Sequence, residues 1–137
     1  ASDVYKRQRE FWWQLRYAWQ RAWRGYDFTD VFELGYNFTA KMPVLLAEFL
    51  KNNVGLFYDA EADKQLDEEE TNAVIKEMIF YFENCDEDHV YQRLHQKRYY
   101  EDGEYDPEKW ESVRVELERC RTEALRLFSK WCFHLWY

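Results

Sequence analysis

The chain has 137 residues, a formal net charge of −8 and an aromatic content of 20%, from seven Trp, eleven Tyr and ten Phe. This length is enough for one domain to bury a hydrophobic core without disulfides or metal ions. Four Gly and two Pro are too few for a turn-rich β-sheet protein, so the composition favours helices. Three cysteines without CxxC spacing argue against a disulfide framework and fit a reducing compartment.

Charge is unevenly distributed along the chain. Residues 1–25 carry six Lys or Arg against two acids, whereas residues 26–137 carry 13 basic and 25 acidic residues. An acidic body argues against duplex nucleic acid as the main ligand, because phosphate neutralisation supplies most of such binding. No apolar run approaches the roughly 18–20 residues that span a membrane, and no signal peptide is recognised. We therefore expect a cytoplasmic protein without a membrane partner.

The first eight residues, ASDVYKRQ, are similar to translated adapter read-through at the ends of open reading frames from metagenomic assemblies. We expect residues 1–8 to be a non-native scar and the true N-terminus to lie upstream of Arg9. Residues 9–137 are then expected to form a single helical domain.

Residues 9–24 predict an aromatic helix that ends at Gly25. Its heptad-like stripe contains Trp12, Leu15, Trp19, Ala22 or Trp23, and Tyr26. Phe11, Trp13 and Tyr17 lie off the stripe, and Arg16 is one turn from Trp12, a spacing that suits a cation–π contact.

Asp27 is placed to cap a second helix, with Asp30 at the third helical position. Val31, Phe32 and Leu34 are then expected to face inward. Gly35 is expected to break or bend the chain, and Asn37 or Thr39 to cap a third helix that continues to about Lys51. Pro43 is tolerated in the first turn of that helix and kinks it further in.

Residues 51–65 predict a connection in which three apolar side chains are tucked down: Val54, Leu56 and Phe57. Asp67, with Glu70, then caps a helix whose apolar side runs from Val74 to Cys85. A break near Asp86 leads to a short helix ending at about Gln96.

Residues 101–106 predict a loop, and Asp106 followed by Pro107 starts the last helix. The last helix carries an apolar stripe to the C-terminus: Trp110, Val113, Leu117, Cys120, Ala124, Leu127 or Phe128, Trp131 and Leu135. The predicted fold is an all-α, single-domain bundle of four main helices with one or two short ones.

Carboxylates offer the only enzymatic hypothesis. Helical bundles that cleave nucleoside triphosphates hold Mg²⁺ between carboxylate pairs on adjacent helices. A Mg²⁺- or Mn²⁺-dependent phosphohydrolase here would use Asp30, Glu33, Glu70 and Glu77. No clean ExxE–ExxD set supports it, and 27 acids make such coincidences common. Capping or solvated roles are favoured for these residues.

Other catalytic patterns are weaker still. His89 and His95 are six residues apart, which does not place them on one helical face, and no Cys pair has zinc-ligand spacing. No Gly-rich phosphate loop or G-x-S-x-G turn is present. An enzyme is therefore the less favoured class, and we expect no cofactor, resident metal or catalytic residue.

The aromatic excess admits three interpretations. A core of large residues in a small bundle is the favoured one. An exposed Trp, Tyr and Arg surface would have the composition of protein-binding hot spots. Base stacking on a single strand is the third, and the net charge disfavours it. If the surface is exposed, the expected contact residues are Arg16, Trp19, Trp23, Trp131 and Trp136.

Four segments together resemble a family of small helical proteins encoded in bacteriophages and phage-derived metagenomic contigs. They are RGYDFTDVFELGYNF, MPVLLAEFLKNN, IKEMIFYFE and the C-terminal EALRLFSKWCFHLWY, so the resemblance covers residues 19–137. This chain lacks the Trp expected near Phe32. The family has no assigned activity, so the resemblance implies a phage origin and residence in the host cytoplasm. The leading hypothesis is a protein that binds protein: itself as a homo-oligomer, a virion or replication component, or a host factor.

Overall fold

The computed structural model describes residues 2–97 and 106–136. Within these residues the protein is all-α, as predicted, with four long and two short α-helices. The only strands there are two residues long and pair as an antiparallel hairpin. The elements are α1 (Ser2–Arg24), α2 (Phe28–Phe32), α3 (Leu34–Asn52), β1 (Tyr58–Asp59), β2 (Lys64–Gln65), α4 (Glu68–Glu83), α5 (Glu87–Arg93), α7 (Pro107–Trp131) and the 3-10 helix η1 (Cys132–His134).

Contacts divide the chain into two compact units, Ala1–Phe38 and Thr39–Tyr137. The boundary falls inside α3, and each unit is described by itself. The single domain expected over residues 9–137 stays a prediction.

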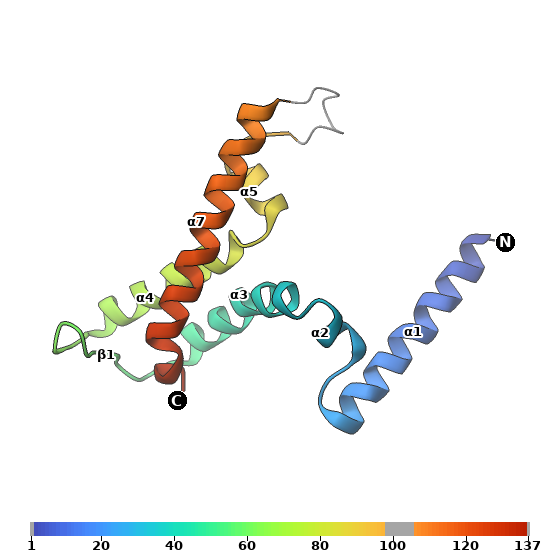
Figure 1. The fold of residues 1–137 in the computed structure, drawn as a ribbon. Coiled ribbons are helices and arrows are strands. Elements are labelled where there is room, and N and C mark those ends of the chain that lie inside the picture. Colours follow the sequence, from blue (N-terminus) through green and yellow to red (C-terminus); the bar gives the residue numbers. More distant parts are fainter. Residues whose placement is uncertain (1, 98–105, 137) are drawn as a thin grey trace. The chain divides into compact units, whose positions relative to one another are not determined.

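The first unit is built around the corner between α1 and α2 (Figure 1). Gly25 ends α1 with φ +82°, a left-handed conformation that glycine adopts without strain. Asp27 then caps α2: its carboxylate accepts the N–H of Asp30 at 3.1 Å, and Asp30 accepts the N–H of Asp27 at 2.9 Å. The carboxylate also accepts from the Thr29 hydroxyl and from Arg21 on α1. Both predicted helix boundaries are confirmed.

Two expectations beside this corner are wrong. Val31, Phe32 and Leu34 are exposed, and α2, which is only about one and a half turns long, buries none of its residues. Gly35 does not break the chain, because α3 begins at Leu34 and continues through it.

The start of α3 also differs from the expected cap. Neither Asn37 nor Thr39 is its N-cap, since both lie within the helix, and the Asn37 side chain instead donates to the Thr29 carbonyl. Pro43 lies well inside α3, beyond the first turn.

The second unit is a helical bundle in which α4 and α5 pack on the long helix α7 (Figure 1). One face of α7 is buried at i, i+3, i+4 and i+7 spacing, as the sequence predicts. From α4 the core receives Ile75, Met78 and Phe82. From α5 it receives Val90 and Tyr91, which cluster with Val113 and Leu117. The buried residues of α7 are Val113, Leu117, Cys120, Ala124, Leu127 and Trp131.

Some residues predicted to be buried at the ends of the core are exposed. Trp110 is about half exposed, because the core begins one turn later, where Val113 meets α5. In the connection after α3, Val54 and Leu56 are exposed and only Phe57 is buried. Asp106 caps α7 as predicted, accepting the N–H groups of Glu108 and Lys109. The predicted loop over residues 101–106 lies outside the described residues except for Asp106.

Candidate functional site

The polar side of α1 is the side that forms the corner. Gln20 accepts the backbone N–H of Phe28 at 3.1 Å, Arg21 pairs with Asp27, and Arg24 donates to the Tyr26 carbonyl at 3.1 Å. At 100° per residue these three residues occupy one side of the helix. The side-chain hydrogen bonds and the ion pair between α1 and the corner therefore come from one side of α1.

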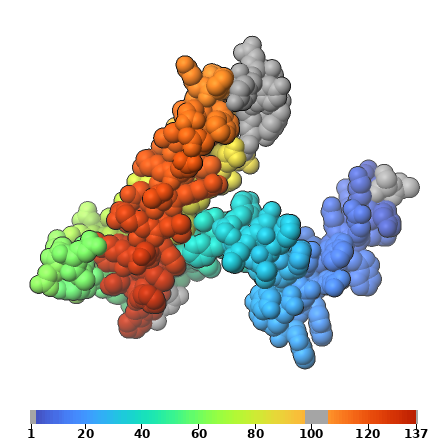
Figure 2. Space-filling model, viewed as in Figure 1, coloured from blue at the N-terminus to red at the C-terminus, as the bar shows by residue number. Residues whose placement is uncertain are grey.

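The opposite side of α1 is apolar. Phe11, Trp12, Leu15, Trp19 and Trp23 share an arc of roughly 120°. All five side chains are exposed, and the fractions for Trp12, Trp19 and Trp23 are 72%, 71% and 81%. The space-filling view in Figure 2 shows the side chains of this helix, coloured blue, standing out from it. We call these five residues the α1 aromatic face.

Arginines border the aromatic face along one edge. Arg9 and Arg16 lie next to Trp12 and Trp23 on the helix surface, and within residues 2–97 and 106–136 neither forms an ion pair. The sequence suggested a cation–π contact between Arg16 and Trp12. In the structure the Arg16 guanidinium instead lies over Trp13, 5.3 Å from the centre of that ring. A shallow hollow of about 490 Å³ opens here, lined by Trp12, Trp13, Leu15, Arg16 and Trp19.

The five predicted contact residues fall into two groups. Arg16, Trp19, Trp23 and Trp136 are exposed, the last to 76%. Trp131 is a core residue, as the stripe of the last helix predicted, so its prediction as a contact residue was wrong. It is 3% exposed, stacks on Phe57 with ring centres 5.4 Å apart, and meets His134 edge-on.

The four carboxylates of the alternative hypothesis have other roles or no shared site. Asp30 and Glu70 each complete a capping box with the N-cap aspartate three residues before them. Glu33 is the C-cap residue of α2, and Glu77 lies in the middle of α4. No group of three or more His, Cys, Asp or Glu side chains that could hold a metal occurs among the residues that the structure describes.

Acidic residues in and after the β1–β2 hairpin have the spacing of a calcium-binding loop, which the sequence analysis did not identify. Four acids stand at positions 1, 3, 5 and 12 of a twelve-residue stretch, the spacing of an EF-hand calcium loop: Asp59, Glu61, Asp63 and Glu70. The sixth position is Lys64 instead of the usual glycine. The Lys64 ammonium lies 2.7 Å from Glu70, and Lys130 of α7 lies 3.3 Å from Asp59 and 3.1 Å from Glu61. The chain's own cations thus pair with Asp59, Glu61 and Glu70, and Asp63 accepts a hydrogen bond from the Tyr58 hydroxyl.

Cys85 and Cys120 do not have the properties of nucleophilic cysteines. Burial raises the pKa of the Cys85 thiol to about 11, and burial beside Glu116 raises the pKa of Cys120. Both thiols therefore stay protonated at neutral pH, whereas a nucleophilic cysteine needs a lowered pKa.

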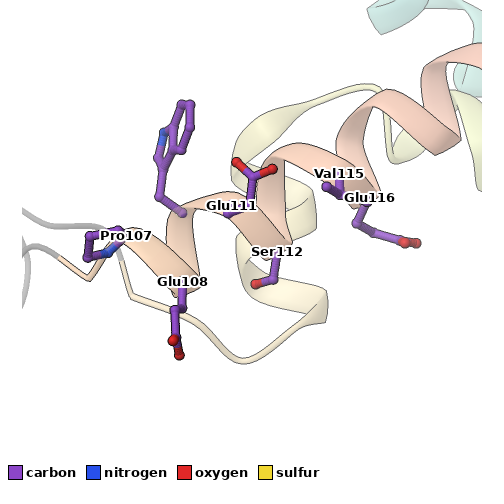
Figure 3. Close-up of a pocket in the computed structure, with 7 residues that line it drawn as sticks. Pro107, Glu108, Glu111, Ser112, Val115 and Glu116 are labelled. Atoms are coloured by element: carbon purple, nitrogen blue, oxygen red, sulfur yellow. The ribbon is translucent and has the colours of Figure 1, made fainter.

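A hollow of about 810 Å³ lies beside the first turns of α7 (Figure 3). The described residues that line it all belong to that one helix: Pro107, Glu108, Trp110, Glu111, Ser112, Val115 and Glu116. These described residues therefore form one wall of the hollow.

Comparisons with known proteins find no matching family model, no matching curated protein and no matching solved structure. None of the described helices combines the length and apolar character needed to cross a membrane. The described residues define an all-α protein whose helix α1 carries an exposed apolar face.

Proposed function

We propose that the protein acts by binding another protein through the α1 aromatic face. The observation that carries this proposal is the division of α1 into two sides. Its polar side is used by the corner, while Trp12, Trp19 and Trp23 on the other side are more than two-thirds exposed. Monomeric proteins rarely leave a contiguous apolar patch of this size in water.

The composition of the face supports a protein partner. Trp, Tyr and Arg dominate binding hot spots because they combine a large apolar area with a polar group at the edge. Each aromatic side chain can bury about 150–250 Å², so the four aromatics supply much of the area of a stable interface. Arg9 and Arg16 provide the polar rim.

The resemblance to phage-encoded helical proteins supports the choice of partners. A second copy of the chain, a virion or replication component and a host factor are the three classes proposed. A host-cell cytoplasm is the proposed location. Metal-dependent hydrolysis has no comparable support, since Asp30 and Glu70 are engaged in helix caps.

Site-specific photo-cross-linking tests the proposal. A benzoylphenylalanine placed at Trp19 should give a covalent protein adduct after irradiation of cells that express the full chain. The matched control is the same group at Gln14, which is exposed on the far side of α1 and should give none. Equal labelling at both positions, or no adduct at Trp12, Trp19 or Trp23, would contradict the proposal.

A further inference from the structure

The aromatic face of α1 follows a seven-residue repeat of large and small side chains. Trp12 and Trp19 occupy one position of the repeat, and Leu15 and Ala22 occupy the other. In coiled coils these are the a and d positions, whose side chains insert between those of the facing helix. The order Trp–Leu–Trp–Ala therefore limits how two such faces can pack.

Antiparallel pairing fits this order. It places an a residue of one helix beside a d residue of the other. When the two-fold axis crosses at the level of residue 17 along the helix, Trp12 faces Ala22 of the second copy and Trp19 faces its Leu15. Every layer then holds one Trp and one smaller side chain, which fills the layers evenly.

Parallel pairing fits poorly. It sets Trp12 against Trp12 and Trp19 against Trp19, which overfills two layers. It also sets Ala22 against Ala22, which leaves a void. Overfilled layers and voids both destabilise packing. The self-complementarity of the face is thus specific to the antiparallel arrangement.

The edges of the face are compatible with the same register. Arg9 comes beside Trp23 of the second copy, a pairing suited to a cation–π contact. On the other edge Ala18 lies next to the two-fold axis and allows close approach. Arg16 meets the Arg16 of the second copy, but both are solvent-exposed and each already lies against its own Trp13. In water this repulsion is weak and screened.

We infer that the occupant of the α1 aromatic face is a second copy of the chain, packed antiparallel with its two-fold axis at the level of residue 17 along the helix. This inference rests on the proposed function and names its partner. The exposed parts of Phe11, Trp12, Leu15, Trp19 and Trp23 amount to roughly 600–700 Å² per copy. A stable interface needs about 800 Å² per partner, so these residues with the flanking alanines and arginines are sufficient.

Cross-linking through single cysteines tests the register in the full-length protein. The background is Cys132→Ser, since Cys85 and Cys120 are buried and Cys132 is partly exposed. Ala18→Cys places two thiols near the axis, whereas Ala22→Cys places each thiol against Trp12 of the other copy. A short bismaleimide should link the Ala18→Cys protein at least about tenfold more than the Ala22→Cys protein. Adding Trp12→Ala and Trp19→Ala should abolish the link, and adding Trp136→Ala should leave it unchanged.

The other outcomes overturn the inference in distinguishable ways. Preferential linking of Ala22→Cys would mean a parallel dimer. No linking of either variant would mean that no second copy occupies the face. Trp13, Trp110 and Trp136 are also exposed, so iodide quenching of the wild type compared with the Trp12→Ala, Trp19→Ala variant would then separate two cases. Less quenchable fluorescence in the variant means that Trp12 and Trp19 are accessible, which leaves the face free for a foreign protein and the proposed function intact. Unchanged quenchable fluorescence would mean that both tryptophans are covered, which would contradict both.

Discussion

Arg93 of α5 and Glu116 of α7 form an ion pair with an N–O distance of 2.5 Å, 23 residues apart in sequence. The same Arg93 donates to the Asn84 side chain at 2.6 Å, just after α4. Glu116 also accepts two hydrogen bonds from Arg119, one turn along α7. A half-buried polar cluster thus joins the ends of α4 and α5 to the middle of α7.

Replacing this carboxylate should destabilise the second unit. We expect Glu116→Gln to lower the free energy of unfolding by about 2 kcal/mol, because it leaves the partly buried Arg93 charge uncompensated. Urea denaturation at neutral pH measures the change. The matched control is Glu118→Gln, whose carboxylate pairs with Arg114 on the exposed side of α7 and should change stability by less than about 0.5 kcal/mol. Equal effects would contradict a special role for the cluster.

The pH dependence of the same substitution has a defined sign. Hydrogen bonds from Arg119, then from Arg93, lower the pKa of Glu116 from 4.5 to about 2. A lowered folded-state pKa stabilises the protein fully above the unfolded pKa, and this stabilisation is lost as the pH falls through the folded pKa. The stability difference between wild type and Glu116→Gln should therefore be constant near neutral pH and shrink between pH 4.5 and 2. A difference that grows on acidification would contradict this origin.

Replacing Asp27 in the corner of the first unit should weaken the N-terminal cap of α2. Hydrogen bonds, first from Thr29 and also from Arg21, lower the pKa of Asp27 to about 2. Asp27→Ala removes the cap of α2, and the amide of Asp30 should exchange its hydrogen roughly five-fold to tenfold faster. Asp27→Asn keeps a capping oxygen and should retain most of the protection at Asp30. Unchanged exchange in both variants would contradict the capping role.

Replacing each of the two C-terminal tryptophans by alanine should change the stability by very different amounts. Trp131→Ala removes a buried ring that stacks on Phe57 and should cost about 3–5 kcal/mol of stability. Trp136→Ala removes an exposed side chain and should change stability by less than about 0.5 kcal/mol. Thermal or urea unfolding of the two variants compares them directly, and similar losses would show that the C-terminal segment packs differently.

Divalent cations should leave the protein nearly unaffected. Lys130 and Lys64 pair with three of the four carboxylates that have calcium-loop spacing, and Asp30 and Glu70 are committed to caps. Millimolar CaCl₂, MgCl₂ or MnCl₂ should therefore shift the melting temperature by less than about 1 °C, since only a ligand that binds the folded state raises it. A rise of several degrees would revive a metal-dependent function, and Lys130→Met would show whether the hairpin is the site.

Local signals in the sequence predicted the starts of α2, α4 and α7. Asp27 with Asp30, Asp67 with Glu70 and Asp106 before Pro107 each cap a helix as expected. These caps depend on atoms within three residues, so sequence alone suffices. The buried stripe of α7 was also predicted, because a 25-residue helix repeats its pattern over many turns.

Burial at single positions was less predictable. Val31 and Phe32 were expected to face inward, yet both are exposed. Trp131 and Trp136 were both expected as contact residues, but Trp131, which also belongs to the predicted stripe of the last helix, packs on Phe57 in the core and Trp136 is exposed. For the α1 aromatic face, the sequence supplied the exposed Trp and Arg candidates. Which side of α1 the corner would use depends on Gln20 and Arg21, whose partners at Phe28 and Asp27 follow the helix.

The most direct test of the central claim is the molar mass of the full-length chain by light scattering behind a size-exclusion column, at two concentrations. The self-complementary α1 aromatic face predicts a dimer that partly dissociates on dilution, and a monomer at both concentrations for Trp12→Ala with Trp19→Ala. A wild-type protein that is monomeric at both concentrations would contradict self-association through this face.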